Sequence, residues 1–328
     1  MPPHGATGLR FVVIIVVVGF LMVGVQRGLR LVGMRREAAT GYALITPWLA
    51  GFLVFTAFPM LYSAYLSFTD YDIFRAPEWT GLENFTRIFT RDRDFWPAIR
   101  ITLLYAFLSV PIGVAGALMV AMLLANDLRG IGVYRTIYYL PTVLPEVAVA
   151  LLWRWILNPQ AGLLNRILGP FFRLFGVSRP DWFGDPQYVL PAYVIISLWG
   201  ITGVNMVIFL AALKNVPNHL YEVAFIDGAG WWRRFRSITL PMISPVIFLQ
   251  VVRGIIAALQ IFTVYAFTAA TPRAGKFMSF YIFQVGFQQF RMGYASALAW
   301  ILFSIILALT LLVLRSSDFW VYYEAERK

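Results

Sequence analysis

A polar island between Glu222 and Pro241 carries the residues whose types and spacing are best suited to specific binding. It reads E-V-A-F-I-D-G-A-G-W-W-R-R-F-R-S-I-T-L-P and lies between long apolar stretches. Asn218, just upstream, is a good helix N-cap, and Gly228 can adopt the left-handed conformation that ends a helix. The spacing predicts a two-turn helix over residues 219–227. Because so short a helix is unstable alone in water, its chemistry is docking, against a partner or against membrane segments.

The stretch that follows Gly228 is typical of a membrane surface. Three aromatic residues alternate with three arginines there: Trp231, Trp232, Arg233, Arg234, Phe235 and Arg236. Arginine stems lie along apolar surface while their guanidinium groups reach water, so an interfacial helix is predicted. Pro241 is predicted to open the next membrane helix, because the first helical turn needs no N–H donor.

Two charged side chains, Glu146 and Arg253, lie inside apolar segments. A charge at mid-bilayer is costly and normally faces the bundle interior, a partner or a wet cavity. At the helical rise per residue, Glu146 lies ~14 Å and Arg253 ~18 Å from the predicted cytoplasmic starts of their helices. We therefore predict that the two charges approach one another or line the same pathway. Two independent charges, each satisfied by water or by a neighbouring chain, are an equal alternative.

Neutral polar residues at membrane depth offer a second kind of chemistry. Asn205 and Gln260, near Trp199 and Tyr265 in the sequence, suit the hydroxyl groups of a sugar, which are held by neutral donors and acceptors with aromatic stacking. Hydrogen bonding between helices is the favoured alternative for any single one of these residues.

Several kinds of site are excluded or disfavoured by residue counts. The chain has no Cys, which excludes disulfides, thiolate metal sites and cysteine nucleophiles. Its two histidines, His4 and His219, lie in a tail and a loop, so a histidine metal site or triad is disfavoured. No G-x-x-x-x-G-K-[ST] occurs, so the chain has no P-loop of its own. We expect no cofactor and no metal in this chain.

The elements that must position these residues are membrane helices. Hydrophobic residues make up 60% of the chain and charged residues only 13%. Backbone polar groups in lipid must be paired internally, and apolar runs of ~20 residues are long enough for helices that cross the bilayer. The net charge of +11 is attributed to Lys and Arg that flank these helices, and no nucleic-acid partner is expected. The sequence predicts an all-α polytopic membrane protein with these seven apolar segments: 11–26, 42–68, 98–125, 137–157, 188–212, 241–268 and 294–315.

The flanks of the first segment determine the predicted orientation. Four arginines follow it within residues 27–36, whereas a secretory signal carries its positive charge before the apolar run. We therefore predict an uncleaved anchor with its N-terminus outside; a cleaved signal is the lesser alternative. This topology places 13 Lys and Arg on the cytoplasmic side and 12 in the outer loops, so orientation depends mainly on the dense arginine clusters near helix ends.

The polar island resembles the E-A-A-x-x-x-G-x(9)-I-x-L-P loop in the permease subunits of binding-protein-dependent ABC importers. The matching positions are Glu222, Ala224, Gly228, Ile238, Leu240 and Pro241. The resemblance implies that these six residues, with Asp227, couple the chain to an ATPase subunit. Further similar stretches begin at Phe58 (F-P-M-L-Y-S-A-Y-L-S-F-T-D), Thr80 (T-G-L-E-N-F), Tyr139 (Y-L-P-T-V-L-P), Leu151 and Met292. The resemblance covers residues 42–316 and is strongest to the carbohydrate branch, the maltose and glycerol-phosphate permeases. Val223 departs from the pattern, as does T-A-A-T-P-R-A-G-K-F, which replaces a glycine-rich stretch.

The resemblance implies a fold, a function and partners. It implies a six-helix type I importer permease core with one extra N-terminal helix, in the prokaryotic cytoplasmic (inner) membrane. The implied domains are an anchor helix and linker (1–41), the permease domain (42–316) with coupling loop 213–240, and a cytoplasmic tail (317–328). The implied partners are a second permease, two cytoplasmic ATPase subunits that bind ATP and Mg²⁺, an extracytoplasmic solute-binding protein, and membrane lipid.

The implied substrate is a sugar, an oligosaccharide or a polyol, and glycerol phosphate stays open because Arg253 favours an anion. The candidate pathway residues are Glu146, Asn205, Arg253 and Gln260. An ion- or proton-coupled secondary transporter, with Glu146 as the coupling charge, is the alternative function. A membrane-embedded enzyme is a third class, disfavoured because candidate catalytic groups are scarce.

Overall fold

The computed structural model describes residues 4–126, 129–176, 178–268 and 276–322, and omits the side chains of residues 4–15, 17 and 201. The chain forms two compact units, Met1–Ser67 and Phe68–Lys328, called here the N-terminal and C-terminal units. The first unit holds residues 42–67 as well as 1–41, and the last helix runs to Trp320. The division into an anchor and linker (1–41), a permease domain (42–316) and a tail (317–328) stays a prediction. The predicted all-α class is confirmed for the described residues.

The N-terminal unit is a helical hairpin with an extended second arm. It contains α1 (His4–Leu31), α2 (Arg36–Phe52), the π-turn η1 (Leu53–Ala57) and α3 (Phe58–Leu66). Small buried residues of α2, Ala39 and Ala43, let it pack closely on α1, and Gln26 Nε2 donates to Thr40 Oγ1 at 2.7 Å. Most of the predicted linker 27–41 is helical: residues 27–31 end α1, residues 36–41 begin α2, and only residues 32–35 connect the two helices. The role of segment 11–26 as an anchor stays a prediction.

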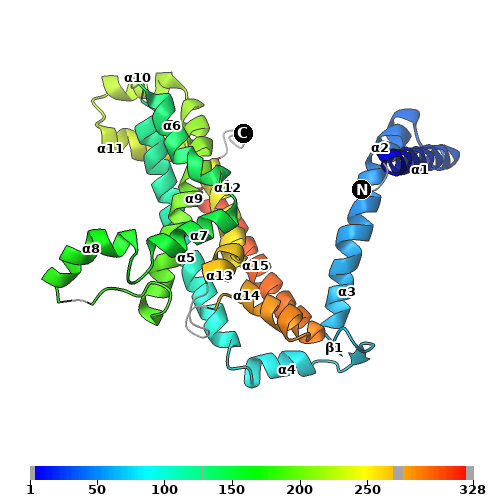
Figure 1. The fold of residues 1–328 in the computed structure, drawn as a ribbon. Helices are drawn as coiled ribbons and strands as arrows, with labels where there is room; N and C mark the ends of the chain where they lie inside the picture. Colours follow the sequence, from blue (N-terminus) through cyan, green and yellow to red (C-terminus); the bar gives the residue numbers. More distant parts are fainter. Residues whose placement is uncertain (1–3, 127–128, 177, 269–275, 323–328) are drawn as a thin grey trace. The chain divides into compact units, whose positions relative to one another are not determined.

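The C-terminal unit begins with a two-stranded antiparallel hairpin and continues in helices (Figure 1). Its elements are β1 (Thr69–Asp70), β2 (Glu78–Trp79), α4 (Glu83–Thr90), α5 (Phe95–Leu124), α6 (Ile131–Tyr139), the 3₁₀ turn η2 (Leu140–Val143), α7 (Glu146–Ile156), α8 (Leu163–Leu174), α9 (Pro186–Lys214), α10 (Asn218–Ile226), α11 (Trp231–Arg234), the π-turn η3 (Phe235–Thr239), α12 (Leu240–Leu259), α13 (Thr263–Thr268), α14 (Met278–Phe283), the π-turn η4 (Gln284–Gln288) and α15 (Met292–Trp320).

The core of this unit lies where α5, α9 and α12 pack together. Small side chains of α5, among them Ala106, Ala117 and Ala121, are buried along it and allow close helix approach. Gly254 of α12 serves the same purpose, because a Cβ there would lie 3.0 Å from Val110 Cγ1. The three helices thus form a tightly packed centre around which the shorter elements are arranged.

Six of the seven predicted apolar segments correspond to candidate membrane spans. Within the described residues, four continuous helical stretches are long and apolar enough to cross a bilayer: Arg36–Leu66, Phe95–Leu124, Trp231–Leu259 and Met292–Trp320. Two bent pairs bring the number to six if each pair is one span: Ile131–Val143 with Glu146–Ile156, and Pro186–Gly200 with Thr202–Lys214. These spans are identified by the length and composition of the helices. The number of six, with each bent pair taken as one span, agrees with the implied six-helix core.

The predicted continuous helix 137–157 is wrong. The two halves of this segment meet at an angle of 101° around Leu144 and Pro145. Leu144 is extended (ψ 138°), as a residue before proline tends to be, and Pro145 occupies the N-cap position of α7. Glu146 therefore opens a helix, in its first turn, and does not lie in the middle of one.

Pro241 lies in the first turn of α12, as predicted, but α12 continues directly from the turn that precedes it. The helical stretch starts at Trp231 and passes through η3, where the Leu240 N–H bonds to the Phe235 carbonyl, five residues back. Such π-turns absorb irregularities in the hydrogen-bond ladder, and proline causes one because it lacks an N–H. The same arrangement recurs where η1 precedes Pro59. The predicted segment 241–268 is in fact divided, because α12 ends at Leu259 before α13.

Candidate functional site

The polar island begins in α10 and continues through α11 and η3 to the start of α12. Helices α10, α11 and α6 lie at one end of the C-terminal unit (Figure 1). The N-cap residue of α10 is Pro217 (φ −61°, ψ 127°), and no side chain caps the helix. The predicted capping by Asn218 is therefore wrong: with the extended cap position taken by proline, Asn218 becomes the first helical residue. The helix itself agrees with the predicted range 219–227 to within one residue.

The C-terminal end of α10 is a complete Schellman motif. Gly228 adopts φ +70°, its N–H bonds to the Phe225 carbonyl at 3.0 Å, and the Ala229 N–H bonds to the Ala224 carbonyl at 2.8 Å. Only glycine enters this left-handed region without steric cost. Two backbone carbonyls that would otherwise be left unpaired at the helix end are thereby satisfied, and the following chain is turned toward α11.

An apolar surface is exposed on α10. Val223 is 56% exposed, Phe225 72% and Ile226 82%, and the carboxylate of Glu222 is exposed beside them. Large apolar side chains with such high solvent exposure usually mark an interaction site when they cluster. We call these three residues the α10 tip.

Contacts behind α10 connect it to the membrane helix that follows. The Tyr221 hydroxyl pairs with Thr239 Oγ1 of η3 at 2.9 Å. Trp231 stacks on Phe235, with ring centroids 5.6 Å apart and planes within 4°. Ile238 packs on the main hydrophobic core, so displacement of α10 would be transmitted to η3 and α12.

The other candidate ATPase-coupling residues have backbone and packing roles. Ala224 is half-buried and supplies a carbonyl to the Schellman motif, Asp227 is the exposed C-cap residue, and Leu240 and Pro241 lie inside the helical stretch that begins at Trp231.

Glu146 and Arg253 make no ion pair with each other; among the residues that the structure describes, the ion pair present joins Lys276 and Asp94. Both side chains are exposed. Glu146 benefits from its place at the N-terminus of α7, where the helix dipole favours a negative charge. Arg253 Nη1 donates only a long hydrogen bond, 3.4 Å, to Gln250 Oε1. That the two charges line one pathway stays a prediction.

Arg253 and Gln260 lie on one face of α12. From Leu249 to the C-cap residue Gln260, the exposed positions are Leu249, Arg253, Ala257 and Gln260, spaced as residues on a single helical face are. Asn205, on α9, is only half-buried. A face with an arginine and a glutamine is a poor surface for lipid, so water or a neighbouring subunit is the better environment for it.

A polar cluster at the opposite end of the unit, around Asp92, was not predicted. Asp92 Oδ2 accepts hydrogen bonds from the hydroxyls of Tyr281 (2.5 Å) and Tyr294 (2.6 Å), and Oδ1 accepts from the backbone of Asp94 and Phe95. Burial raises the pKa of Asp92, but these four donors outweigh it and hold the pKa below its usual value. Lys276 bonds to Asp94 at 3.1 Å and lies over the Tyr281 ring. The cluster joins the start of α5 to α14 and α15.

No pattern along the chain predicts the Asp92 cluster, because Asp92 and Asp94 lie about 190 residues from Tyr281, Tyr294 and Lys276. The α10 tip was missed for a different reason. Val223, Phe225 and Ile226 are apolar members of the polar island, and only their exposure in the fold shows that they do not pack into the core.

Comparisons with known proteins agree with this geometry. Residues 102–321 match the family model described as binding-protein-dependent transport system inner membrane component. The probable ABC transporter permease protein YesP of Bacillus subtilis (strain 168) is 40% identical over 301 residues, which is 90% of this chain and 96% of that protein. The trehalose/maltose transport system permease protein MalF of Thermococcus litoralis is 33% identical, over 87% of this chain and 95% of its own length. A chain of a bacterial alginate ABC transporter, solved with an alginate pentasaccharide-bound periplasmic protein, superimposes with a TM-score of 0.73 at 26% identity, covering 84% of this chain and 93% of that one.

Proposed function

This chain belongs to the family of inner membrane components of binding-protein-dependent transport systems, and we propose that it forms, with a second permease, the passage for ATP-driven uptake of a carbohydrate. It is a permease, a transport subunit and not an enzyme. ATP hydrolysis would then belong to two separate cytoplasmic subunits, and an external binding protein would deliver the substrate. The trehalose/maltose and alginate relatives support a sugar or an oligosaccharide as that substrate.

The observation that carries the proposal is the α10 tip. A two-turn helix with three bare apolar side chains is incomplete without a partner that covers them. The Schellman motif at its end and its hydrogen bond to η3 make α10 suited to transmit a displacement by its partner to α12. The partner is the ATPase subunit, so the α10 end of the unit faces the cytoplasm.

A co-purification experiment tests this assignment. The tagged chain is expressed with its neighbouring genes, extracted in mild detergent, and the accompanying subunits are identified and quantified by mass spectrometry. Phe225→Ser and Glu222→Ala are expected to lower the amount of bound ATPase subunit several-fold. Phe287→Ser is the matched control, because Phe287 is similarly exposed (63%) at the other end of the unit. Equal recovery of the ATPase subunit with all three variants would contradict docking at the α10 tip.

The exposed guanidinium of Arg253 favours a second candidate substrate class, an acidic carbohydrate. Its one described hydrogen bond is long, so most of its donors are available for a carboxylate or a phosphate. In uptake assays with the full transporter, Arg253→Gln should reduce transport of oligo-uronates far more than transport of neutral oligosaccharides. An equal reduction for both would assign Arg253 to structure or to the sister permease.

A further inference from the structure

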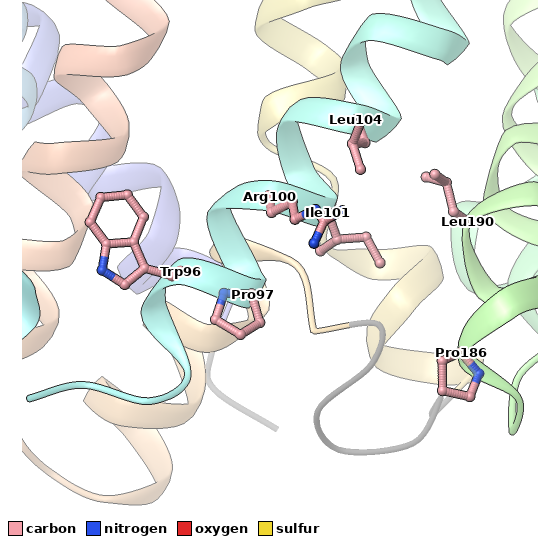
Figure 2. A pocket seen from close by; sticks show the side chains of 7 residues that line it. All are labelled: Trp96, Pro97, Arg100, Ile101, Leu104, Pro186 and Leu190. Carbon is pink, nitrogen blue, oxygen red and sulfur yellow. The ribbon is translucent and has the colours of Figure 1, made fainter.

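A groove lies between the first turns of α5 and α9, away from the α10 tip (Figure 2). Its volume is about 490 Å³, and it is lined by Trp96, Pro97, Arg100, Ile101, Leu104, Pro186 and Leu190. Six of these seven side chains are apolar, so Arg100 is the one charged group that borders the space. The proposed function assigns no role to this groove.

Arg100 has no partner in the described part of the chain. Its side chain is exposed, and it takes part in no ion pair and no side-chain hydrogen bond there. Arginine presents five donors in a planar fork that matches phosphate and carboxylate oxygens. The groove therefore offers an anion-binding group above an apolar floor.

The depth of Arg100 is fixed by the Asp92 cluster. Asp94 and Lys276 form an ion pair just before α5 begins, and charged groups of this kind mark the water side. Arg100 lies six residues further along, or ~9 Å at the helical rise. The headgroup layer on each side of a bilayer is about 5–8 Å thick. The Cα of Arg100 is thus placed at the inner edge of the headgroup layer, from which the long arginine side chain can reach a phospholipid phosphate.

The exposed face of α5 that continues from Arg100 is wholly apolar. It comprises Leu104, Phe107, Leu108, Pro111, Ile112, Ala115, Met119 and Leu123. A face that lines a passage for sugars would carry polar groups, as the exposed face of α12 does. This face of α5 instead suits acyl chains.

Trp96 marks the boundary between the two environments. It is 56% exposed, and its indole Nε1 donates to the Phe89 carbonyl at 3.4 Å, while its ring packs against Phe89 and Phe95. Tryptophan held at this level is typical of membrane–water interfaces.

We propose that the groove binds a phospholipid, with its phosphate on the Arg100 guanidinium and one acyl chain along Ile101, Leu104 and Leu190. In the orientation proposed above, this lipid belongs to the outer leaflet. An anionic headgroup is preferred over a zwitterionic one, because nothing in the described groove repels it and Arg100 adds a positive charge. The site is separate from substrate passage and from the α10 tip.

Native mass spectrometry tests the site on the full-length chain, purified with the subunits that accompany it. Phosphatidylglycerol and phosphatidylcholine are added in turn, and bound lipid is counted for the wild type, Arg100→Gln and Arg93→Gln. Arg93 is the matched control: an exposed arginine near the same end of α5 but outside the groove. We expect Arg100→Gln to lower phosphatidylglycerol occupancy at least five-fold, Arg93→Gln to leave it unchanged, and phosphatidylcholine to bind more weakly.

Two further measurements distinguish the lipid from two other possible ligands of the groove, a free phosphate and the second permease. Excess glycerol 1-phosphate should not displace the lipid; displacement would show that a free phosphate is the ligand and would overturn the proposal. A photo-cross-linking residue at position 104 should capture lipid, and capture of the second permease would identify a subunit interface instead. Unchanged lipid occupancy in Arg100→Gln, with a thermal transition equal to that of the wild type, would also overturn it. None of these readouts depends on transport, so they are independent of the proposed function.

Discussion

At the scale of single residues, Gly228 shows how a short motif position is determined by backbone geometry. Its φ of +70° completes the Schellman motif that ends α10, and any residue with a Cβ is strained there. Gly230, two residues later, has φ −65° and open space around its Cα, so a methyl group fits. These two glycines therefore form a matched pair.

We expect Gly228→Ala to strain the end of α10 by about 1–2 kcal/mol and to lower substrate-stimulated ATP hydrolysis by the assembled transporter. Gly230→Ala should retain the wild-type rate. The measurement is ATPase activity in proteoliposomes with and without substrate-loaded binding protein. Equal rates for the two variants would mean that the Schellman geometry is not needed for coupling.

Asp92 holds together the end of the C-terminal unit that lies opposite α10, where the start of α5 meets α14 and α15. Its lowered pKa means that the folded state favours the carboxylate, since four donors outweigh burial. The resulting stability is fully present above the unfolded pKa of about 3.9 and is lost as the pH falls through the lower folded value.

Asp92→Asn should therefore lower the stability of the detergent-solubilised protein at pH 7 by about 1–3 kcal/mol, because two tyrosine hydroxyls and two N–H groups lose a charged acceptor. The difference from the wild type should shrink as the pH falls below about 4. Thermal unfolding followed across pH measures both effects, with the exposed Asp70→Asn as control. A difference that does not depend on pH would assign the effect to packing.

At the scale of elements, the broken segment of α6, η2 and α7 requires a close approach to α9. A Cβ at Gly203 would lie 2.5 Å from the Tyr138 carbonyl oxygen and 2.6 Å from Thr142 Cγ2. Gly200, one turn earlier on the same helix, has nothing within 4 Å of that position. Glycine at 203 is thus needed for packing against backbone, which cannot move as a flexible side chain can.

Gly203→Ala should separate η2 from α9 and destabilise the protein by about 1–3 kcal/mol, the usual cost of overpacking. Gly200→Ala should be neutral or slightly stabilising, because alanine is the better helix former. The temperature of the thermal transition, measured for each purified variant, compares the two effects on stability. If both variants unfold at the wild-type temperature, the two segments do not pack as closely as described.

At the scale of the whole molecule, the family assignment separates two energy sources for transport. A secondary transporter, the alternative raised by Glu146, would stop when the ion gradient collapses. An importer of this family should take up substrate only when ATP is supplied, and this uptake should continue when a protonophore is present. Uptake into right-side-out vesicles, free of inverted ones, measures the dependence on ATP and the dependence on the ion gradient. Glu146→Gln should retain ATP-dependent uptake. Loss of uptake with the protonophore at constant ATP would contradict the assignment.

The sequence by itself determined the fold class, the apolar segments that form the candidate membrane spans, and the place of α10, because these depend on local properties. Apolar length decides what can cross a bilayer, and the order of Glu222, Gly228 and Pro241 is a pattern along the chain. Gly228 could be assigned its left-handed conformation for the same reason, since no other residue adopts it as readily.

Only the tertiary structure decided where helices break and which side chains stay bare. The bend at Leu144, the π-turn before Pro241 and the capping by Pro217 result from competition among neighbouring backbone groups, which residue preferences alone do not settle. The Asp92 cluster, the exposure of the α10 tip and the place of Arg100 beside the groove depend on how segments far apart in the chain pack. Exposure is a property of the packed molecule, and the same apolar residue is core or docking surface according to what covers it.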